Sequence, residues 1–265
     1  MLQILAGGWK LGRRDNLRKE PRKWFYREMP WDFWLIVLFL GVVIPWRGHA
    51  RLKKLLAMPS VDTKEKLAVY AATIGFQWAL AALVAWRASA RRLTAEELGL
   101  GPRPLLPVLT AGIVGALVVG GLQWLNLRRI GKMKGPTVDL LRKLASRLLP
   151  VSWLEYMPYA ALALTAGVCE EFLYRGFVMG ALGRLALPVW AVVALTSILF
   201  GLAHAYQGKA GIVSTGLFGV ILALGRLGFG SLLPVMMWHA SLDLVAGHAA
   251  PKYLLSARVE NGQGK

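Results

Sequence analysis

The chain has 265 residues, of which 56% are hydrophobic and 17% charged, and its mean hydropathy is +0.48. A soluble domain carries about 25% charged residues, so this composition indicates a membrane protein. The formal net charge is +18, and the cations lie in the N-terminal tail and between the apolar segments. We attribute this charge to contacts with anionic lipid headgroups and to membrane topology, and we expect no nucleic-acid partner.

The first thirty residues form a basic tail that lacks the apolar stretch of a secretory signal. A tail of this kind suits anionic headgroups and favours a cytosolic N-terminus, although the Lys and Arg residues of the loops divide almost evenly between the two sides. Its cations are Lys10, Arg13, Arg14, Arg18, Lys19, Arg22, Lys23 and Arg27.

Seven apolar segments follow, and they predict an all-α, polytopic membrane bundle of about seven transmembrane helices. The first segment is short, so the expected number ranges from six to eight. The alternating pattern of a membrane barrel is absent from the sequence. The segments cover approximately residues 31–46, 67–86, 105–125, 156–182, 188–206, 210–224 and 231–248.

Two connections carry their own helix signals. Thr94 and Glu97 form a Thr-x-x-Glu capping box, which predicts a short surface helix. Residues 128–150 alternate leucines with Lys and Arg, as an amphipathic helix at the membrane interface does. We divide the chain into a basic cytosolic tail (1–30), N-terminal membrane helices with interfacial connections (31–150), a catalytic membrane core of four segments (151–250) and a short polar tail (251–265).

Two adjacent carboxylates, Glu170 and Glu171, interrupt the fourth apolar segment. A carboxylate at hydrocarbon depth costs several kcal/mol, so it is seldom kept without a partner or a task. Glu171 and Arg175 are four residues apart and share a helix face, which predicts an ion pair. Glu170 points about 100° away and has no opposite charge at helical spacing. Glu170 is therefore the candidate for binding water, a proton or a metal; the alternative is that all three charges end a helix at the interface.

Two later apolar segments also carry ionisable residues. Phe200 and His204 share one face of the fifth segment, and His239 and Asp243 share one face of the seventh. Taken alone, a histidine such as His204 on an apolar helix is more often a hydrogen-bonded core residue than a ligand, and the His239–Asp243 pair is explained equally well by helix packing. At a rise of 1.5 Å per residue, however, Glu170, His204, His239 and Asp243 fall within about 10 Å in depth. The three helices are thus predicted to build one shared site.

Two kinds of chemistry suit these residue types. Glu170 with the imidazoles could deprotonate water for attack on a carbonyl, while the remaining donors stabilise the oxyanion. Alternatively, His204, His239 and a carboxylate from Asp243 or Glu170 would supply three ligands to a catalytic Zn²⁺. The histidines and glutamates of this chain do not follow the H-E-x-x-H spacing, so the zinc-binding helix of soluble metalloproteases does not apply. Cys169, the single cysteine, excludes an intrachain disulfide, and a buried cysteine beside Glu170 is more often a small hydrophobe than a nucleophile.

These motifs resemble the CPBP family (also called ABI) of intramembrane proteases. Glu170-Glu-Phe-Leu-Tyr-Arg175 is similar to its EExxxR motif, Phe200-Gly-Leu-Ala-His204 to FxxxH, and His239-Ala-Ser-Leu-Asp243 to HxxxN/D. The family includes CAAX prenyl endoproteases and bacterial bacteriocin-processing or immunity proteins. The resemblance covers approximately residues 165–247, and its strength lies in three motifs in order on membrane helices.

The resemblance implies an intramembrane endopeptidase that acts on membrane-associated peptides or proteins in a bacterial inner membrane. It implies that Glu170 and His204 activate water, that His239 and Asp243 complete the site, and that Glu171 and Arg175 hold the motif helix. Family members are described both as metalloproteases and as metal-independent glutamate proteases, so a zinc ion stays an alternative. The CAAX endoproteases typically have Asn where this chain has Asp243, which weakens the case for a prenylated substrate.

Two non-proteolytic functions remain open from the sequence. A non-catalytic immunity or scaffold protein would keep the same motifs for helix packing. A proton-coupled transporter would also place carboxylates and histidines inside the membrane. Transporters often have repeated halves with broken helices, and the sequence shows no internal repeat.

Overall fold

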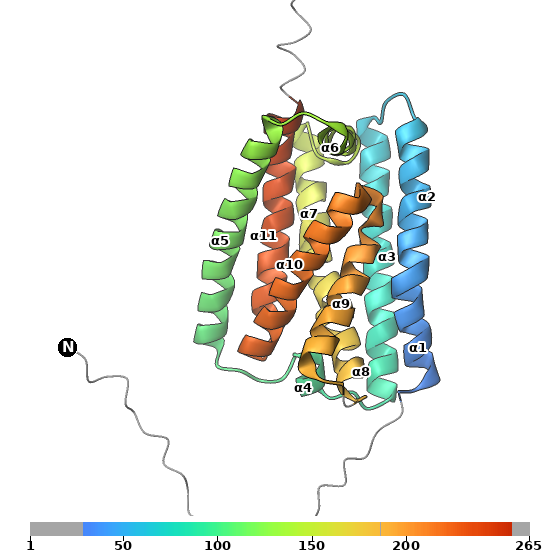
Figure 1. The fold of residues 1–265 in the computed structure, drawn as a ribbon, viewed down its shortest axis with the longest axis vertical. Helices are drawn as coiled ribbons and strands as arrows, with labels where there is room; N and C mark the ends of the chain where they lie inside the picture. Colours follow the sequence, from blue (N-terminus) through green and yellow to red (C-terminus); the bar gives the residue numbers. More distant parts are fainter. Residues whose placement is uncertain (1–28, 186, 256–265) are drawn as a thin grey trace, which may run out of the picture.

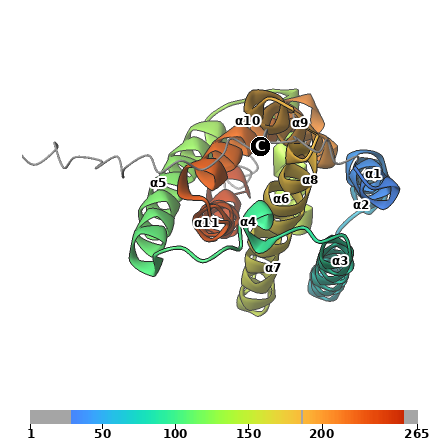
Figure 2. The ribbon, with the colours of Figure 1, turned by 90° about the horizontal axis from the view of Figure 1, so that it is seen from below.

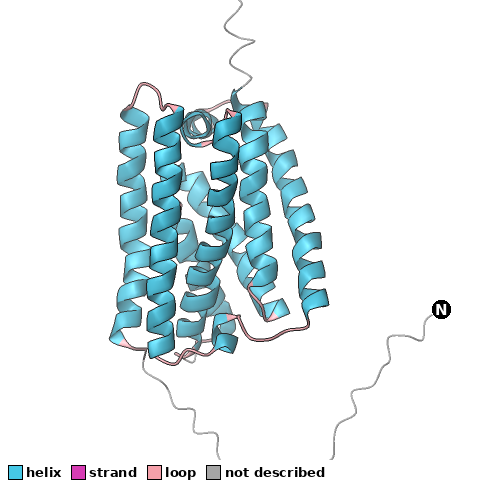
Figure 3. Ribbon diagram, turned by 180° about the vertical axis from the view of Figure 1, so that it is seen from behind, coloured by secondary structure: helices cyan, strands magenta, loops and turns pink. Residues whose placement is uncertain are grey.

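The computed structural model describes residues 29–185 and 187–255. Within these ranges the chain is a helical bundle without strands (Figure 3), which confirms the all-α, polytopic architecture. The predicted basic tail at 1–30 and the predicted polar tail at 251–265 fall mostly outside the described residues.

Each of the seven predicted apolar segments coincides with a helical run (Figure 1). The runs are α1 (Trp31–Leu38), η1 (Phe39–Val43) and α2 (Ile44–Ala57); α3 (Thr63–Ala90); α5 (Leu105–Gly131); α7 (Trp153–Glu171), η2 (Phe172–Val178) and α8 (Met179–Gly183); α9 (Val189–Ala203); η3 (Ala205–Gln207) and α10 (Gly208–Phe229); and α11 (Leu233–Ala250) with η4 (Pro251–Leu255).

Four of these runs are long and apolar enough to cross a membrane by length and composition. They are Trp31–Ala57, Thr63–Ala90, Leu105–Gly131 and Ala205–Phe229, whereas the apolar helix Val189–Ala203 is shorter. The chain is therefore an integral membrane protein, and the total of about seven spans stays a prediction.

The first run is longer than its apolar part. We expected it to end near residue 46, but the helix continues to Ala57. A π-helical turn, η1, precedes Pro45, as is common where a proline removes one backbone donor. The added turns are amphipathic and carry Arg51, Lys53 and Lys54, so hydropathy alone does not detect them.

The two predicted connecting helices are both present. In α4 (Ala95–Leu98), the Thr94 hydroxyl accepts a hydrogen bond from the Glu97 amide (3.2 Å), and the Glu97 carboxylate accepts one from the Thr94 amide (2.7 Å). Arg184 at the end of α8 also binds that carboxylate at 2.6 Å, which ties α4 to the bundle. At the opposite end, α6 (Pro136–Leu148) lies across the bundle and buries Val138, Leu144 and Ala145 (Figure 1).

Helix α11, which carries the last motif, packs between α5 and α7 (Figure 2). Glycine makes the approach of α5 possible, because a Cβ atom at Gly115 would lie 2.0 Å from the Trp238 indole nitrogen. That nitrogen donates to the Ala111 carbonyl (3.0 Å), and the Ser241 hydroxyl donates to the Ala116 carbonyl (2.7 Å). These contacts fix the rotation of α11 and hence the direction of His239 and Asp243.

A buried ion pair fastens α3 to the start of α7. Lys66 Nζ lies 3.1 Å from Glu155 Oε2, and the two side chains are 3% and 1% exposed. Lys66 also donates to the Leu149 carbonyl, and Thr63 donates to the second Glu155 oxygen. Such a network stabilises only while every member is present, since removing one partner leaves a buried charge unpaired.

We expect Lys66→Met to lower the free energy of unfolding by about 3 kcal/mol or more, because it leaves Glu155 without its cation. Glu96→Gln is the matched control: it breaks the Arg103–Glu96 pair, whose side chains are 36% and 53% exposed, and it should cost less than about 1 kcal/mol. Denaturation of both variants in the same detergent measures the difference. Equal losses would contradict a stabilising role for the buried pair.

Candidate active site

The two adjacent glutamates close α7 immediately before the π-helical turn η2, which carries Arg175. Glu171 and Arg175 are both completely buried, and Arg175 Nη1 donates to Glu171 Oε1 at 2.8 Å. The predicted ion pair is therefore present. The helix continues through buried Phe177 and Val178 of η2 into α8, so the charges lie within it and do not end it at an interface.

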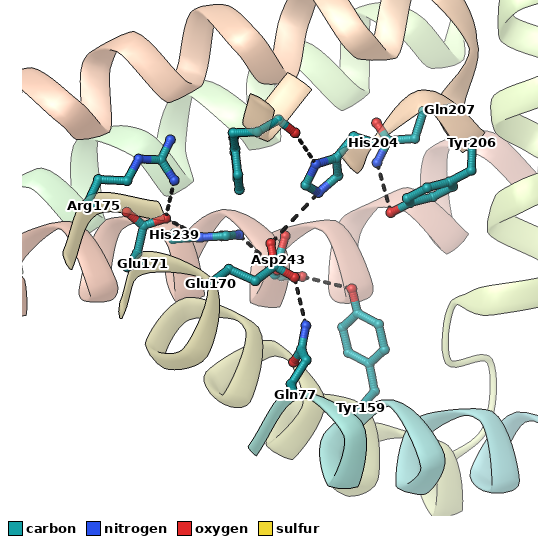
Figure 4. Close-up of polar contacts among 11 residues, drawn as sticks. Gln77, Tyr159, Glu170, Glu171, Arg175, His204, Tyr206, Gln207, His239 and Asp243 are labelled. Carbon is teal, nitrogen blue, oxygen red and sulfur yellow. Dashed lines mark hydrogen bonds and ion pairs between the residues drawn. The ribbon is translucent and has the colours of Figure 1, made fainter. Parts of the chain in front are cut away.

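Glu171 has a second partner that helix spacing does not reveal. His239 Nδ1 lies 2.8 Å from the same Glu171 oxygen, across the α7–α11 contact (Figure 4). Asp243, the expected partner of His239 on its own helix, lies farther away, with Oδ2 at 3.6 Å from Nε2. The assignment of Glu171 to Arg175 alone was thus incomplete: one buried oxygen holds both the arginine and the histidine.

Arg175 extends this cluster to two further helices. Its guanidinium carbon lies 4.1 Å from the centroid of the Phe200 ring, a cation–π contact with α9. Its Nη2 donates to the Gly219 carbonyl of α10 at 3.2 Å. Phe200 is 1% exposed and its ring packs edge-on against His239. The predicted supporting residue Phe200 therefore lies between the buried cation and the imidazole.

Glu170 faces the more open side of the cluster, opposite His204. The two side chains are 19% and 16% exposed, and Glu170 Oε2 lies 3.9 Å from His204 Nε2. His204 Nδ1 lies 2.9 Å from the Phe200 carbonyl oxygen. Because a carbonyl only accepts, Nδ1 carries the proton in this contact, and Nε2 of the neutral ring is an acceptor directed at Glu170.

Asp243 completes the set predicted from the sequence. Its side chain is 29% exposed, and Figure 4 shows Glu170, His204 and Asp243 directed toward one another. Tyr159 on α7 donates to the Asp243 backbone carbonyl at 3.1 Å. The structure thus brings together Glu170, His204, His239 and Asp243 from α7, α11 and the turn after α9, as the depth argument requires. Their catalytic roles stay predictions.

The sequence did not predict one polar contact of the site. Gln77 on α3 donates from Nε2 to Glu170 Oε1 at 2.7 Å. We expected Glu170 to have no opposite charge at helical spacing, and its partner Gln77 is indeed a neutral amide on another helix. A glutamine in the middle of an apolar membrane segment is the signal that would have identified it, because a polar group there needs a partner. No helical spacing links α3 to α7, so the partner itself was not predictable.

The donor set does not form a preformed zinc site. In the described ranges, no three His, Cys, Asp or Glu side chains gather closely enough to hold a metal ion. The two Nδ1 atoms contact Phe200 and Glu171, an outer-shell arrangement like that of zinc-binding histidines. The side chains would nevertheless have to move to form three metal bonds. Cys169 is completely buried, which supports its interpretation as a small hydrophobe.

The adjacent glutamates should differ in their effect on stability. We expect Glu171→Gln to lower the free energy of unfolding by about 3–5 kcal/mol, because buried Arg175 would lose its counter-charge. Glu170→Gln keeps an acceptor for Gln77 at a partly exposed position, so it should change the same quantity by less than about 1 kcal/mol. Denaturation in detergent compares the two variants. A larger loss from Glu170→Gln would contradict this division.

Comparison with protein families supports the motif interpretation. Residues 152–245 match the model described as type II CAAX prenyl endopeptidase Rce1-like. The match begins one residue before α7 and ends within α11, so it contains every site residue named above except Gln77. Searches of curated proteins and of solved structures returned no match. Residues 152–245, which carry the three motifs, are therefore similar to the type II CAAX prenyl endopeptidase Rce1-like proteins, in agreement with the resemblance to the CPBP family.

Proposed function

We propose that this protein is an intramembrane endopeptidase in which Glu170 and His204 activate the attacking water. Its substrates would be membrane-associated proteins or peptides in a bacterial inner membrane, as the family resemblance implies. The observation that carries the proposal is the pairing of two acceptors, Glu170 Oε2 and His204 Nε2, at 3.9 Å on the more exposed side of the cluster.

This separation suits a shared water better than a direct bond. A distance of 3.9 Å exceeds that of a hydrogen bond, and polar contacts of this length are commonly bridged by water. A water between two acceptors donates both of its protons to them, which leaves an oxygen lone pair for attack on a carbonyl carbon. Glu170 takes one proton as the carbon–oxygen bond forms, and it returns that proton to the amine nitrogen as the carbon–nitrogen bond breaks.

His239 is the proposed donor to the oxyanion. With Nδ1–H bound to Glu171, the second ring nitrogen faces the site beside Asp243. An imidazolium there satisfies the buried Glu171 carboxylate and presents Nε2–H to the developing charge. Asp243 favours that cation, but as an anion it also opposes a nearby oxyanion. Asp243→Asn should therefore keep activity if the residue only orients His239.

A zinc ion is the alternative, with His204, His239, Asp243 and Glu170 as its candidate ligands. Bound zinc would lower the pKa of a coordinated water. Metal analysis of the purified protein, together with the chelator sensitivity of cleavage, separates the two mechanisms. Stoichiometric zinc that is lost in Asp243→Ala would favour the metal, whereas full activity of the metal-free protein would favour the glutamate–histidine pair.

We expect Glu170→Gln to reduce peptide cleavage at least 100-fold, because the amide cannot accept the water proton. The assay uses purified protein in lipid vesicles with a membrane-associated peptide, and the melting temperature is recorded for each variant. Cys169→Ala is the matched control at the adjacent position and should remain active. If Glu170→Gln leaves both cleavage and the cellular phenotype unchanged, a non-catalytic scaffold or immunity function replaces the proposal.

Gln77→Leu should lower kcat about tenfold with little change in KM, because Glu170 would lose the hydrogen bond that directs its carboxylate. Gln77→Glu places a like charge against Glu170 and should be worse than Leu. Thr73→Val, one turn earlier on α3, is the control. An unchanged kcat would show that Gln77 only packs.

A further inference from the structure

A basic cavity lies at the end of the bundle where the C-terminus of α5, the crosswise helix α6 and η4 meet. Its volume is about 790 Å³, and its cationic lining residues are Lys132, Lys134, Arg142 and Lys143 against the single acid Asp139. A second cavity of about 210 Å³ shares Lys132 and adds Arg128 and Arg129. Six cations thus surround two adjoining hollows.

Several arginines at the opposite end of the bundle have acidic partners, although Arg92 and Arg226 there take part in no ion pair among the described residues. Arg184 binds Glu97, Arg103 binds Glu96, and Arg87 and Arg91 both bind Asp32. The charges of these four arginines are neutralised within the protein.

The cavity cations are different. Arg142 contacts Asp139 at 3.5 Å and donates to the Gly131 and Met133 carbonyls, so it holds the loop after α5. Within the described part of the chain, Lys132, Lys134 and Lys143 take part in no ion pair. The cavity therefore keeps a positive charge available to a ligand.

Its position in the fold indicates which anion would reach it. The cavity adjoins Gly131, the last residue of the membrane-span candidate Leu105–Gly131, and α6 lies across the same end of the bundle (Figure 1). Met133, Leu254 and Leu255 supply apolar wall beside the lysines. Below them, α5 exposes Leu122 and Leu125 on its outer surface. The lysine-lined cavity thus lies at the end of α5, next to an apolar surface of the same helix that acyl chains could contact.

We propose that this cavity is a binding site for the phosphate headgroup of an anionic phospholipid. Lys132, Lys134 and Lys143 bind the phosphate oxygens, and the acyl chains lie along the exposed leucines of α5. The excess of cations favours a lipid with net negative charge over a zwitterionic one. This site is separate from the catalytic cluster, so the inference does not depend on the proposed proteolysis.

The test measures lipid binding to the full-length protein in detergent, by native mass spectrometry and by thermal stabilisation. The probes are phosphatidylglycerol, phosphatidylcholine with the same acyl chains, and inorganic phosphate. Lys132→Gln/Lys134→Gln/Lys143→Gln removes three cavity charges. The control Arg51→Gln/Lys53→Gln/Lys54→Gln removes three exposed charges from α2, which ends at the same side of the bundle.

We expect wild-type protein to prefer phosphatidylglycerol to phosphatidylcholine, and the cavity variant to lose on the order of 100-fold in affinity for it. The α2 control should stay within about twofold of wild type. The proposal is overturned if both triple variants lose the same affinity or if phosphatidylcholine binds equally well. Equal stabilisation by inorganic phosphate would instead identify a site for free phosphate. Should the triple variant unfold, Lys134→Gln alone must still weaken the lipid preference.

Discussion

The buried carboxylate of Glu171 is the interaction on which the rest of the site depends. One of its oxygens accepts from Arg175 on the same helix and contacts His239 on α11, both at 2.8 Å, with no solvent access to Glu171 or Arg175. A carboxylate in such surroundings needs compensating charge, and here two cationic or donor groups supply it. Because Arg175 also reaches Phe200 and Gly219, this one anion holds α7, α9, α10 and α11 in fixed register.

Because Glu171 is bound within this buried network, the adjacent Glu170 remains available for chemistry. Glu170 is the preceding residue on α7, yet its side chain faces another direction, toward partly exposed His204 and Asp243. Its contacts are a neutral amide and an imidazole acceptor, and neither neutralises its charge. The division of labour between two identical side chains follows from burial and partner charge: a fully paired carboxylate holds structure, and a partly exposed one remains able to take up a proton.

At the two ends of the bundle, too, the role of a charged side chain depends on whether it has a partner of opposite charge. Around α4 and α8, arginines are paired with acidic side chains and join the loops to the helix ends. Around α6, cations exceed acids and line cavities at the ends of the membrane helices. Paired charges fasten the fold, whereas the unpaired lysines around α6 remain available to the anionic headgroup that we propose.

The sequence by itself determined the helical segments, the α4 capping box, the amphipathic α6 and the Glu171–Arg175 pair, because each depends on residues within a few positions along one helix. Counting the rise per residue also brought Glu170, His204 and Asp243 to one depth. Only the tertiary structure decided that His239 contacts Glu171 more closely than Asp243, and that Gln77 binds Glu170. Those contacts depend on how α3, α7 and α11 are rotated against one another, and side-chain packing sets that rotation over the whole helix interface.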